Sequence, residues 1–364
     1  MTIKNSFKAF TATMLCVGIL SGCSDSSATG NSDNSMSSDS KPQTPSVSES
    51  IETQGTDSQS GGEASDNTDL AVNINITALS GPTAMGMTKL MEDSEAEGYS
   101  YEFSIVSAVD ELSPKVVKGD TDIFCVPANL ASVLYNKTEG GVKVLAVNTL
   151  GVIYICENGN TVTSVSDLKG KTVYASGKNA TPEYALNYIL TQNGIDPEKD
   201  LTIEWKSEHA ECVAALLADE NGVAMLPQPF VTSAQAQNDG INAVLDLTEE
   251  WNKLDNGSAM ITGVVAVRTE FAEENPEAVN EFLTRYAASV EYVNANVSEA
   301  AQLVEKYGII KAAVAEKAIP KCNIVCITAE EMKEKLSGYL NVLFEQVPEA
   351  VGGAVPADDF YYGA

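Results

Sequence analysis

Histidine and arginine are the scarcest functional residues in this chain of 364 amino acids. It has one histidine, His209, and its only arginines are Arg268 and Arg285. A cluster of histidine and cysteine, the usual ligand set of a zinc enzyme, is missing from the sequence, and a single histidine disfavours a Ser-His-Asp hydrolase. The sequence therefore predicts no metal, no cofactor and no catalytic residue, and we expect that the protein is not an enzyme.

Basic residues are few in general. The chain has 22 Lys and Arg against 51 Asp and Glu, which gives a formal net charge of −29. So negative a chain is a poor partner for nucleic acid or for an anionic lipid surface. Its hydrophobic content of 44% is that of a globular protein, and its length predicts about two domains with ample core.

Long hydrophobic runs are also absent, and the one near the N-terminus is short. Lys4 and Lys8 precede a mostly apolar run from Ala9 to Leu20, whereas a membrane span needs about 20 apolar residues. Residues 1–22 are therefore interpreted as a signal peptide. The run ends in Leu-Ser-Gly-Cys at Cys23, which resembles the lipobox of bacterial lipoproteins. We expect a lipid on Cys23; an ordinary cleaved signal with an unrelated cysteine is the alternative.

Aromatic residues are missing from the segment that follows. Residues 24–69 hold 14 serines and nine acidic residues and no aromatic residue. Such a segment cannot bury enough apolar surface to offset the entropy of ordering it. We interpret residues 23–71 as a disordered tether, with an end-to-end distance of roughly 35 to 40 Å if it is a flexible coil.

Cysteine is present but predicts no disulfide framework. Cys16 lies in the signal peptide and Cys23 is the lipid site, so five cysteines remain in the folded part: Cys125, Cys156, Cys212, Cys322 and Cys326. An odd number leaves at least one thiol unpaired. Cys322 and Cys326 either form a disulfide, which export permits, or pack as small apolar residues.

The folded part alternates short apolar runs with amphipathic segments, which indicates an α/β protein. Strands are expected at 72–79, 101–106, 122–126 and 142–147, with helices beginning near Thr83, Asp110 and Ala128. A second series follows, with strands at 171–175, 201–205, 223–226 and 243–245 and helices at 181–192, 208–218 and 230–237. Each series predicts one parallel-sheet lobe.

A third group of elements follows, with a strand expected at 261–267 and then helices at 276–294, 298–307, 311–318 and 329–344. This helical segment is too small for a core of its own, so it should pack on an existing lobe. We expect two lobes, the first built from 72–149 and 262–364 and the second from 150–261. Two crossings near 149–154 and 258–263 should join them.

Four turns have the form of ligand-binding turns, because ligands of open α/β sheets gather beyond the carboxyl ends of strands and near helix N-termini. These turns are ALSGPTAMGM (78–87), FCVPAN (124–129), ASGKNATPEY (175–184) and MLPQPF (225–230). Thr181 is expected to be an N-cap residue with Pro182 at the first helical position. Each turn alone is explained by backbone geometry and capping. Together, on two matching lobes, they favour a cleft.

For three residues in or near these turns, a role that involves no ligand is the alternative to ligand binding. Lys178, the only basic residue of the four turns, fits a solvated surface side chain, and Met85 fits either core or pocket wall. His209, at the start of a helical segment, is expected to be exposed.

The order of these segments resembles the type II substrate-binding proteins of ABC importers, within them the nitrate, taurine/sulfonate and thiamine-precursor group. Its most specific parts are LKGKTV and ADENGVAMLPQP, and the resemblance covers nearly all of 72–345. It implies a two-lobed type II periplasmic-binding-protein fold with two hinge crossings. It also implies a lipid-anchored, extracytoplasmic, monomeric receptor that passes a small molecule to a membrane permease. A sensing receptor without transport, or an enzyme on the same fold, are the alternatives.

The resemblance also implies which residues face the ligand. They come from all four turns: Ser80, Gly81, Thr83, Met85, Pro127, Asn129, Lys178, Asn179, Thr181, Gln228 and Pro229. Anion-binding members usually place arginine or several hydroxyls in the cleft, whereas Arg268 and Arg285 are assigned here to a strand end and a helix. We therefore expect a small, neutral or weakly charged organic ligand.

Overall fold

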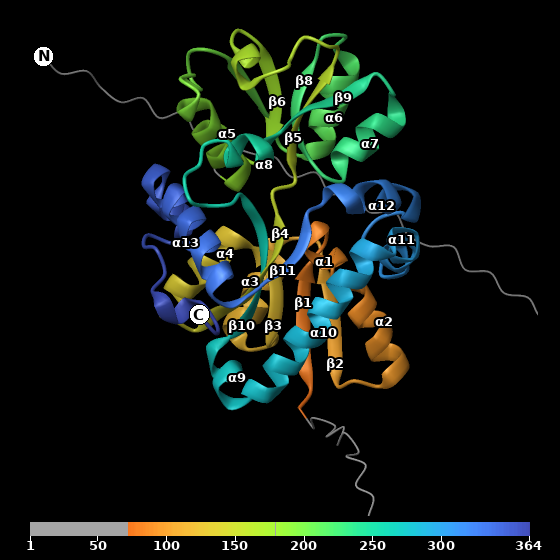
Figure 1. Ribbon diagram of the computed structural model, residues 1–364, viewed down its shortest axis with the longest axis vertical. Coiled ribbons are helices and arrows are strands. Elements are labelled where there is room, and N and C mark those ends of the chain that lie inside the picture. The colour runs from red at the N-terminus through yellow and green to blue at the C-terminus, as the bar shows by residue number, and fades with distance from the viewer. Residues whose placement is uncertain (1–71, 179) are drawn as a thin grey trace, which may run out of the picture. The chain divides into compact units, whose positions relative to one another are not determined.

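The computed structural model describes residues 72–178 and 180–364 (Figure 1). The predicted signal peptide (1–22), the lipid site Cys23, the tether (23–71) and Asn179 lie outside the described residues. Within the described ranges, no helix is both long and apolar enough to cross a membrane.

The first sheet contains six strands in the order β11-β4-β10-β3-β1-β2. They are β1 (Ile74–Leu79), β2 (Tyr101–Val106), β3 (Ile123–Pro127), β4 (Val142–Leu150), β10 (Ile261–Arg268) and β11 (Ile324–Ile327). β1 is parallel to β2 and β3, whereas β10 is antiparallel to β3 and β4, and β11 is antiparallel to β4. The central strands read as continuous apolar runs because helices cover both faces of the sheet.

The second sheet contains five strands in the order β7-β6-β8-β5-β9. They are β5 (Ile153–Asn158), β6 (Thr172–Ser176), β7 (Thr202–Lys206), β8 (Val223–Pro227) and β9 (Ile241–Asp246). β6 is parallel to β7 and β8, and β5 is antiparallel to β8 and β9. We call each sheet with its helices a lobe.

The expectation of two parallel sheets is wrong, because both sheets are mixed. The chain leaves the first lobe along β4 and returns along β10, which enters between β3 and β4 and runs against both. In the second lobe β5 enters between β8 and β9 in the same manner. Two strands were also missed: β5, which begins where a crossing was expected, and β11, a four-residue strand that follows the 3₁₀ helix at 319–321.

Helices cover both faces of the first sheet (Figure 1). One face carries α1 (Pro82–Met85), α2 (Thr88–Glu97), α9 (Thr269–Glu274), α10 (Pro276–Ala295), α11 (Val297–Lys306) and α12 (Ala312–Ala318). The other face carries α3 (Val109–Lys118), α4 (Ala128–Lys137) and α13 (Ala329–Gln346). Short 3₁₀ helices lie at η1 (Val165–Leu168), η2 (Ile319–Lys321), η3 (Pro348–Val351) and η4 (Asp358–Phe360).

The second sheet is covered in the same way. On one face lie α5 (Thr181–Gln192) and α8 (Leu247–Asn252), whose apolar side chains join the core beneath β6. On the other lie α6 (His209–Ala218) and α7 (Phe230–Gln237), which bury Cys212, Leu216 and Val231 against β5 and β8. The helices predicted at 181–192 and 230–237 are confirmed.

Two short segments connect the lobes, one between β4 and β5 and one between α8 and β10. Two glycines lie at points of close approach here, Gly151 in the first segment and Gly263 in β10, just after the second. A Cβ atom at Gly151 would lie 2.2 Å from Thr248 Oγ1, and one at Gly263 would lie 2.4 Å from Thr83 Cγ2. Neither contact is tolerable for a larger residue. The domain limits given above for the two lobes remain a prediction, because the described residues form a single compact unit by their contacts.

The C-terminal helix α13 packs on both lobes. It contacts α4 of the first lobe and α5 of the second. Tyr339 of α13 lies 5.5 Å from the ring of Trp251 in α8, and Trp251 lies 4.8 Å from Tyr188 in α5. Trp251 and Tyr339 are fully buried. The prediction that the helical segment packs on one existing lobe is therefore correct only in part, because α13 contacts both lobes.

The five cysteines of the folded part are all unpaired, including Cys322 and Cys326. Burial raises the pKa of the Cys322 thiol to about 12 and that of Cys326 to about 11. Of the two readings of this pair, the structure matches packing without a disulfide.

A buried ion pair ties three strands of the first lobe together. Asp122 accepts hydrogen bonds from the backbone N–H of Asn75 at 2.9 Å and from its side-chain amide at 3.0 Å. Its other oxygen lies 3.0 Å from Nη2 of Arg268, at the end of β10. The same guanidinium also contacts Glu270, whose side chain is 72% exposed.

We predict that Asp122→Ala lowers the free energy of unfolding by about 1 to 3 kcal/mol, because two donors of Asn75 lose their acceptor and Arg268 loses the better buried of its two carboxylate partners. Glu270→Ala removes the exposed partner of the same arginine and should cost about 0.2 to 1 kcal/mol. Urea unfolding of both variants measures the difference. Equal losses would show that the buried pair does not hold the strands.

Candidate functional site

A cavity of about 370 Å³ lies where the two lobes meet, and we call it the interlobe cavity. Several of its residues end strands: Pro127 ends β3, Ser176 ends β6 and Pro227 ends β8. This is the usual position of a ligand in open α/β sheets, and the volume is that of a small-molecule site. The lining residues are Val109, Pro127, Asn129, Leu130, Val152, Ile153, Ser176, Ala180, Thr181, Pro182, His209, Met225, Pro227, Met260 and Thr262.

As far as the structure describes it, the lining is mostly apolar and includes no lysine, arginine, aspartate or glutamate. Its polar side chains are those of Asn129, Ser176, Thr181, His209 and Thr262. A buried charge needs a paired charge or several donors, and this set offers hydroxyl, amide and imidazole groups only. The cavity is therefore suited to a molecule with an apolar body and a few hydrogen-bonding groups.

One hydrogen bond crosses the cavity between the lobes. Thr181 Oγ1, at the start of α5, donates to Asn129 Oδ1, at the start of α4, at 3.1 Å. The amide of Asn129 is oriented in turn by its Nδ2, which donates to the carbonyl of Ala350 at 3.2 Å. Two predicted contact residues are thus brought together from opposite lobes, and Pro127 lines the same cavity.

His209 lies in the cavity wall, so the expectation that it is exposed is wrong. Its Nδ1 is 2.5 Å from Ser176 Oγ, and its ring lies 4.9 Å from that of Phe230. Burial lowers the pKa of the imidazole below its ordinary value of 6.5. The neutral ring is the favoured form at neutral pH.

A second hollow of about 510 Å³, the side cavity, adjoins the first on the second lobe. The two share Ser176, Ala180, Pro182 and His209, so His209 stands between them. Of the described residues that line the side cavity, one is charged, Glu208.

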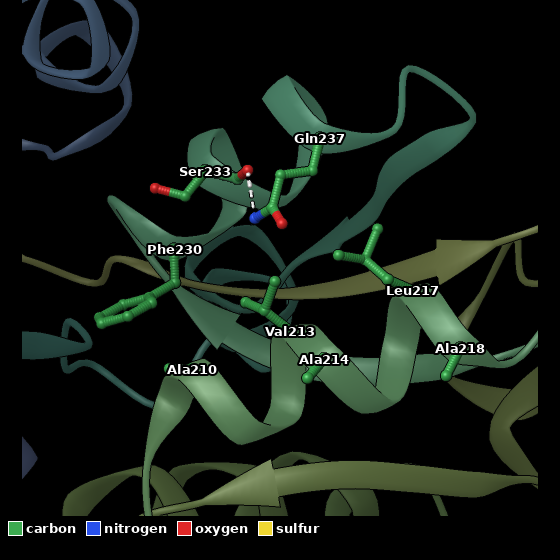
Figure 2. Close-up of a pocket in the computed structure, with 8 residues that line it drawn as sticks. All are labelled: Ala210, Val213, Ala214, Leu217, Ala218, Phe230, Ser233 and Gln237. Atoms are coloured by element: carbon green, nitrogen blue, oxygen red, sulfur yellow. Dashed lines mark hydrogen bonds between the residues drawn. The ribbon is translucent and has the colours of Figure 1, made fainter.

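An open groove of about 630 Å³ continues the side cavity between α6 and α7, and we call it the α6–α7 groove (Figure 2). It shares Ala210 and Phe230 with the side cavity and is otherwise lined mainly by alanine, valine and leucine side chains. Gln237 Nε2 donates to the carbonyl of Ser233 at 3.1 Å across its rim. The amide N–H of Gln237 is therefore satisfied within α7.

Four predicted contacts belong to the turn after β1. Ser80 and Gly81 are half-buried, and Thr83 is buried with its Oγ1 donating to the carbonyl of Leu79 at 2.8 Å. Met85 is fully buried in the core of the first lobe. None of these four lines the cavities described above, and their contact with a ligand remains a prediction.

The remaining predicted contacts belong to the second lobe. Lys178 is exposed and lines neither cavity, and Asn179 lies outside the described residues. Gln228 is buried; its Oε1 accepts from Thr232 at 2.9 Å and its Nε2 has no hydrogen-bond partner. Pro229 precedes α7. Contact of these residues with a ligand also remains a prediction.

Sequence reasoning placed one cap wrongly and missed part of the lining. The N-cap of α5 is Ala180, one residue before Thr181. Ser176 and His209 were missed as a pair, although a signal for His209 was present. It follows the strand β7 and opens α6, so it occupies the same kind of strand-to-helix turn as the four that were selected.

Metal binding is not indicated by the described residues. Across residues 72–178 and 180–364, no group of three or more His, Cys, Asp or Glu side chains is arranged to hold an ion.

Three solved structures are similar to this chain. An ABC transporter protein from Parabacteroides distasonis has a TM-score of 0.68 and 22% identity, over 79% of this chain and 98% of that chain. The periplasmic aliphatic sulphonate-binding protein SsuA from Escherichia coli has a TM-score of 0.62 and 16% identity, over 77% and 90%. A Candida albicans protein with the generic periplasmic binding protein fold has a TM-score of 0.52 and 14% identity, over 79% and 93%. These likenesses show the fold, and the expected two-lobed type II fold is confirmed.

Sequence comparison gives the family. No curated protein sequence matches the chain significantly. A family profile described as the periplasmic substrate-binding protein of a phosphonate ABC transporter matches residues 86–318, which is more than half of the chain. The chain therefore belongs to this family, and it is a type II periplasmic substrate-binding component of an ABC importer.

Proposed function

We propose that the protein is a lipid-anchored, extracytoplasmic receptor that captures a small neutral or weakly charged organic molecule in the interlobe cavity and delivers it to an ABC import permease. The observation that supports this best is the composition of the cavity. Residues of both lobes line it, several of them lie at strand ends, and none of the described lining residues carries a full charge at neutral pH. Binding without catalysis agrees with this lining.

Two findings argue against a phosphonate or sulfonate as the ligand. A doubly charged phosphonate would have to leave water for a cavity whose described lining offers no cation, which is costly. In addition, Lys178, the only basic residue of the predicted turns, is exposed and lies outside that lining. The profile's name describes the family, and this chain's own residues favour a less charged ligand.

Closure of the two lobes supplies the expected mechanism of capture. A ligand that touches both lobes binds the closed form better than the open one, and this difference in affinity drives closure. Asn129 and Thr181 already meet across the cavity, so they are placed to contact a ligand and to favour the closed form.

We predict that a thermal-shift screen of taurine, methylphosphonate, nitrate, thymine, glutamine and nicotinamide identifies a neutral or weakly charged compound. At about 100 times its dissociation constant it should add roughly 2.7 kcal/mol to stability. Asn129→Ala and Thr181→Ala should each weaken its binding by about 1 to 3 kcal/mol, because partners lose their hydrogen bonds. Thr191→Ala, at the exposed end of the same helix α5, is the matched control. Unchanged affinity in both cavity variants would place the ligand elsewhere.

We also predict that Cys23→Ala moves the protein from the membrane to the soluble fraction. Two or three acyl chains give stable anchoring. Without the acceptor cysteine the exported protein carries no acyl chain that would hold it on the membrane. Cys16→Ala, inside the expected signal peptide, should leave the protein on the membrane. Fractionation of cells that express each full chain measures the outcome, and a Cys23 variant that stays in the membrane would refute lipidation.

A further inference from the structure

His209 is held in a fixed orientation between the two cavities. Ser176 Oγ is engaged with its Nδ1 at 2.5 Å, and Phe230 packs on the ring at 4.9 Å. Among the residues that the structure describes, no hydrogen bond to its other nitrogen, Nε2, is found. Because His209 lines both cavities, this free nitrogen is available to a bound molecule.

The charged groups nearest to His209 in its own lobe are mostly acidic. Glu208 precedes it in the side cavity, and Glu211 lies two residues further along α6, where its carboxylate accepts from the backbone of Ser207. Lys206, at the end of β7, is paired with Glu204 at 2.7 Å. None of these charges enters into the pKa of His209, which burial alone lowers.

The other elements around His209 present few charges. On α5, Pro182 lines both cavities and Glu183 follows it, and α7 contributes the ring of Phe230. Cys212, the titratable neighbour within α6, has its thiol pKa raised by burial. Across the interlobe cavity, α3 contributes Val109, which is followed by the exposed Asp110. Lys178 in the β6–α5 turn is exposed.

We propose that His209 is a specificity-determining residue that selects ligands by charge. The neutral imidazole would hydrogen-bond an uncharged polar group, such as an amide or a ring nitrogen, through Nε2. Protonated His209 would supply the single positive charge among the described residues that line the interlobe cavity, and it would admit a monoanion. The ligand class at neutral pH is therefore a neutral compound with an apolar ring and one hydrogen-bonding group. The inference rests on the proposed function, because it requires that the interlobe cavity is the ligand site.

The first test measures the proton on His209 directly. Since the chain has one histidine, the full chain made without a histidine tag gives one imidazole signal when Cε1 is labelled with ¹³C. We predict that its pKa lies below 6.5. The folded state then keeps its full stability above this pH and loses stability as the pH falls below it, because the unfolded chain binds the proton more readily. A pKa at or above 6.5 would contradict the proposal.

The second test compares benzamide, benzoate and phenylphosphonate, which share a ring and differ in charge. By calorimetry at about pH 8, benzamide should bind at least about tenfold more tightly than benzoate, and phenylphosphonate should bind most weakly. Toward about pH 5, benzoate should gain affinity while benzamide does not. Saturating benzoate should in turn raise the pKa of His209, by about one unit for each tenfold preference for the protonated form.

Two variants separate this role from simple packing. His209→Gln keeps a neutral hydrogen-bonding group that cannot titrate, so it should retain benzamide and lose the pH dependence of benzoate binding. Ser176→Ala frees the ring and should weaken benzamide, whereas Ser233→Ala on α7, which lies outside the interlobe cavity, should have no effect.

Different outcomes would overturn the role of His209 or the proposed receptor function. Benzoate affinity that ignores pH, or phenylphosphonate as the tightest of the three at about pH 8, would overturn the role of His209. Taurine or methylphosphonate bound in place of benzamide, and weakened by Asn129→Ala, would also overturn it while leaving the receptor function intact. Binding that neither Asn129→Ala nor His209→Gln changes would overturn both.

Discussion

The fold depends on a topological constraint: both segments that cross between the lobes connect to strands that are hydrogen-bonded within a sheet. β4 and β10 lie side by side and antiparallel in the first sheet, and β4 leads directly into β5 of the second. A strand that is bonded to its neighbours in a sheet cannot rotate freely. The crossings therefore restrict relative motion of the lobes to bending and twisting near Gly151 and Gly263, where larger side chains would collide with Thr248 and Thr83.

The same constraint creates the site. With β4 and β5 joined by two residues, the ends of β3 and β6 face a common space, and the side chains that follow them meet. Asn129 and Thr181 are 52 positions apart in the chain and are hydrogen-bonded across that space. The net negative charge of the chain repels an anion. The described cavity wall offers no positive charge that would compensate one.

Regular elements were predictable where one physical signal was strong. Strand 101–106 and helix 181–192 agree with the structure at both ends, because apolar patterning and flanking glycine or proline mark them. β5 was missed because its apolar residues merge with those of the crossing, and β11 because four residues leave too little pattern. Strand direction was also out of reach, since a strand that pairs antiparallel across a hinge has the same composition as a parallel one.

The candidate site was predictable only in part. The family resemblance, applied to the four strand-to-helix turns, led to Pro127, Asn129 and Thr181, which line the interlobe cavity. They also selected Met85, which lies in the core, because the sequence does not tell which side of a one-turn helix faces the protein interior. His209 was taken for a surface residue because its burial arises from Ser176 and Phe230, which are distant in sequence.

The position of α13 gives the hinge a third member that is not covalent. Gly338 of this helix is so close to the second crossing that a Cβ atom there would lie 2.8 Å from that of Ser258, and Ser258 Oγ accepts from Trp251 Nε1 at 3.0 Å. Tyr339 adds its ring to the same cluster. If the lobes separate, the ring of Tyr339 in the C-terminal helix must move relative to the ring of Trp251 in α8. An aromatic contact of this kind stabilises the arrangement of the lobes whether or not a ligand is bound.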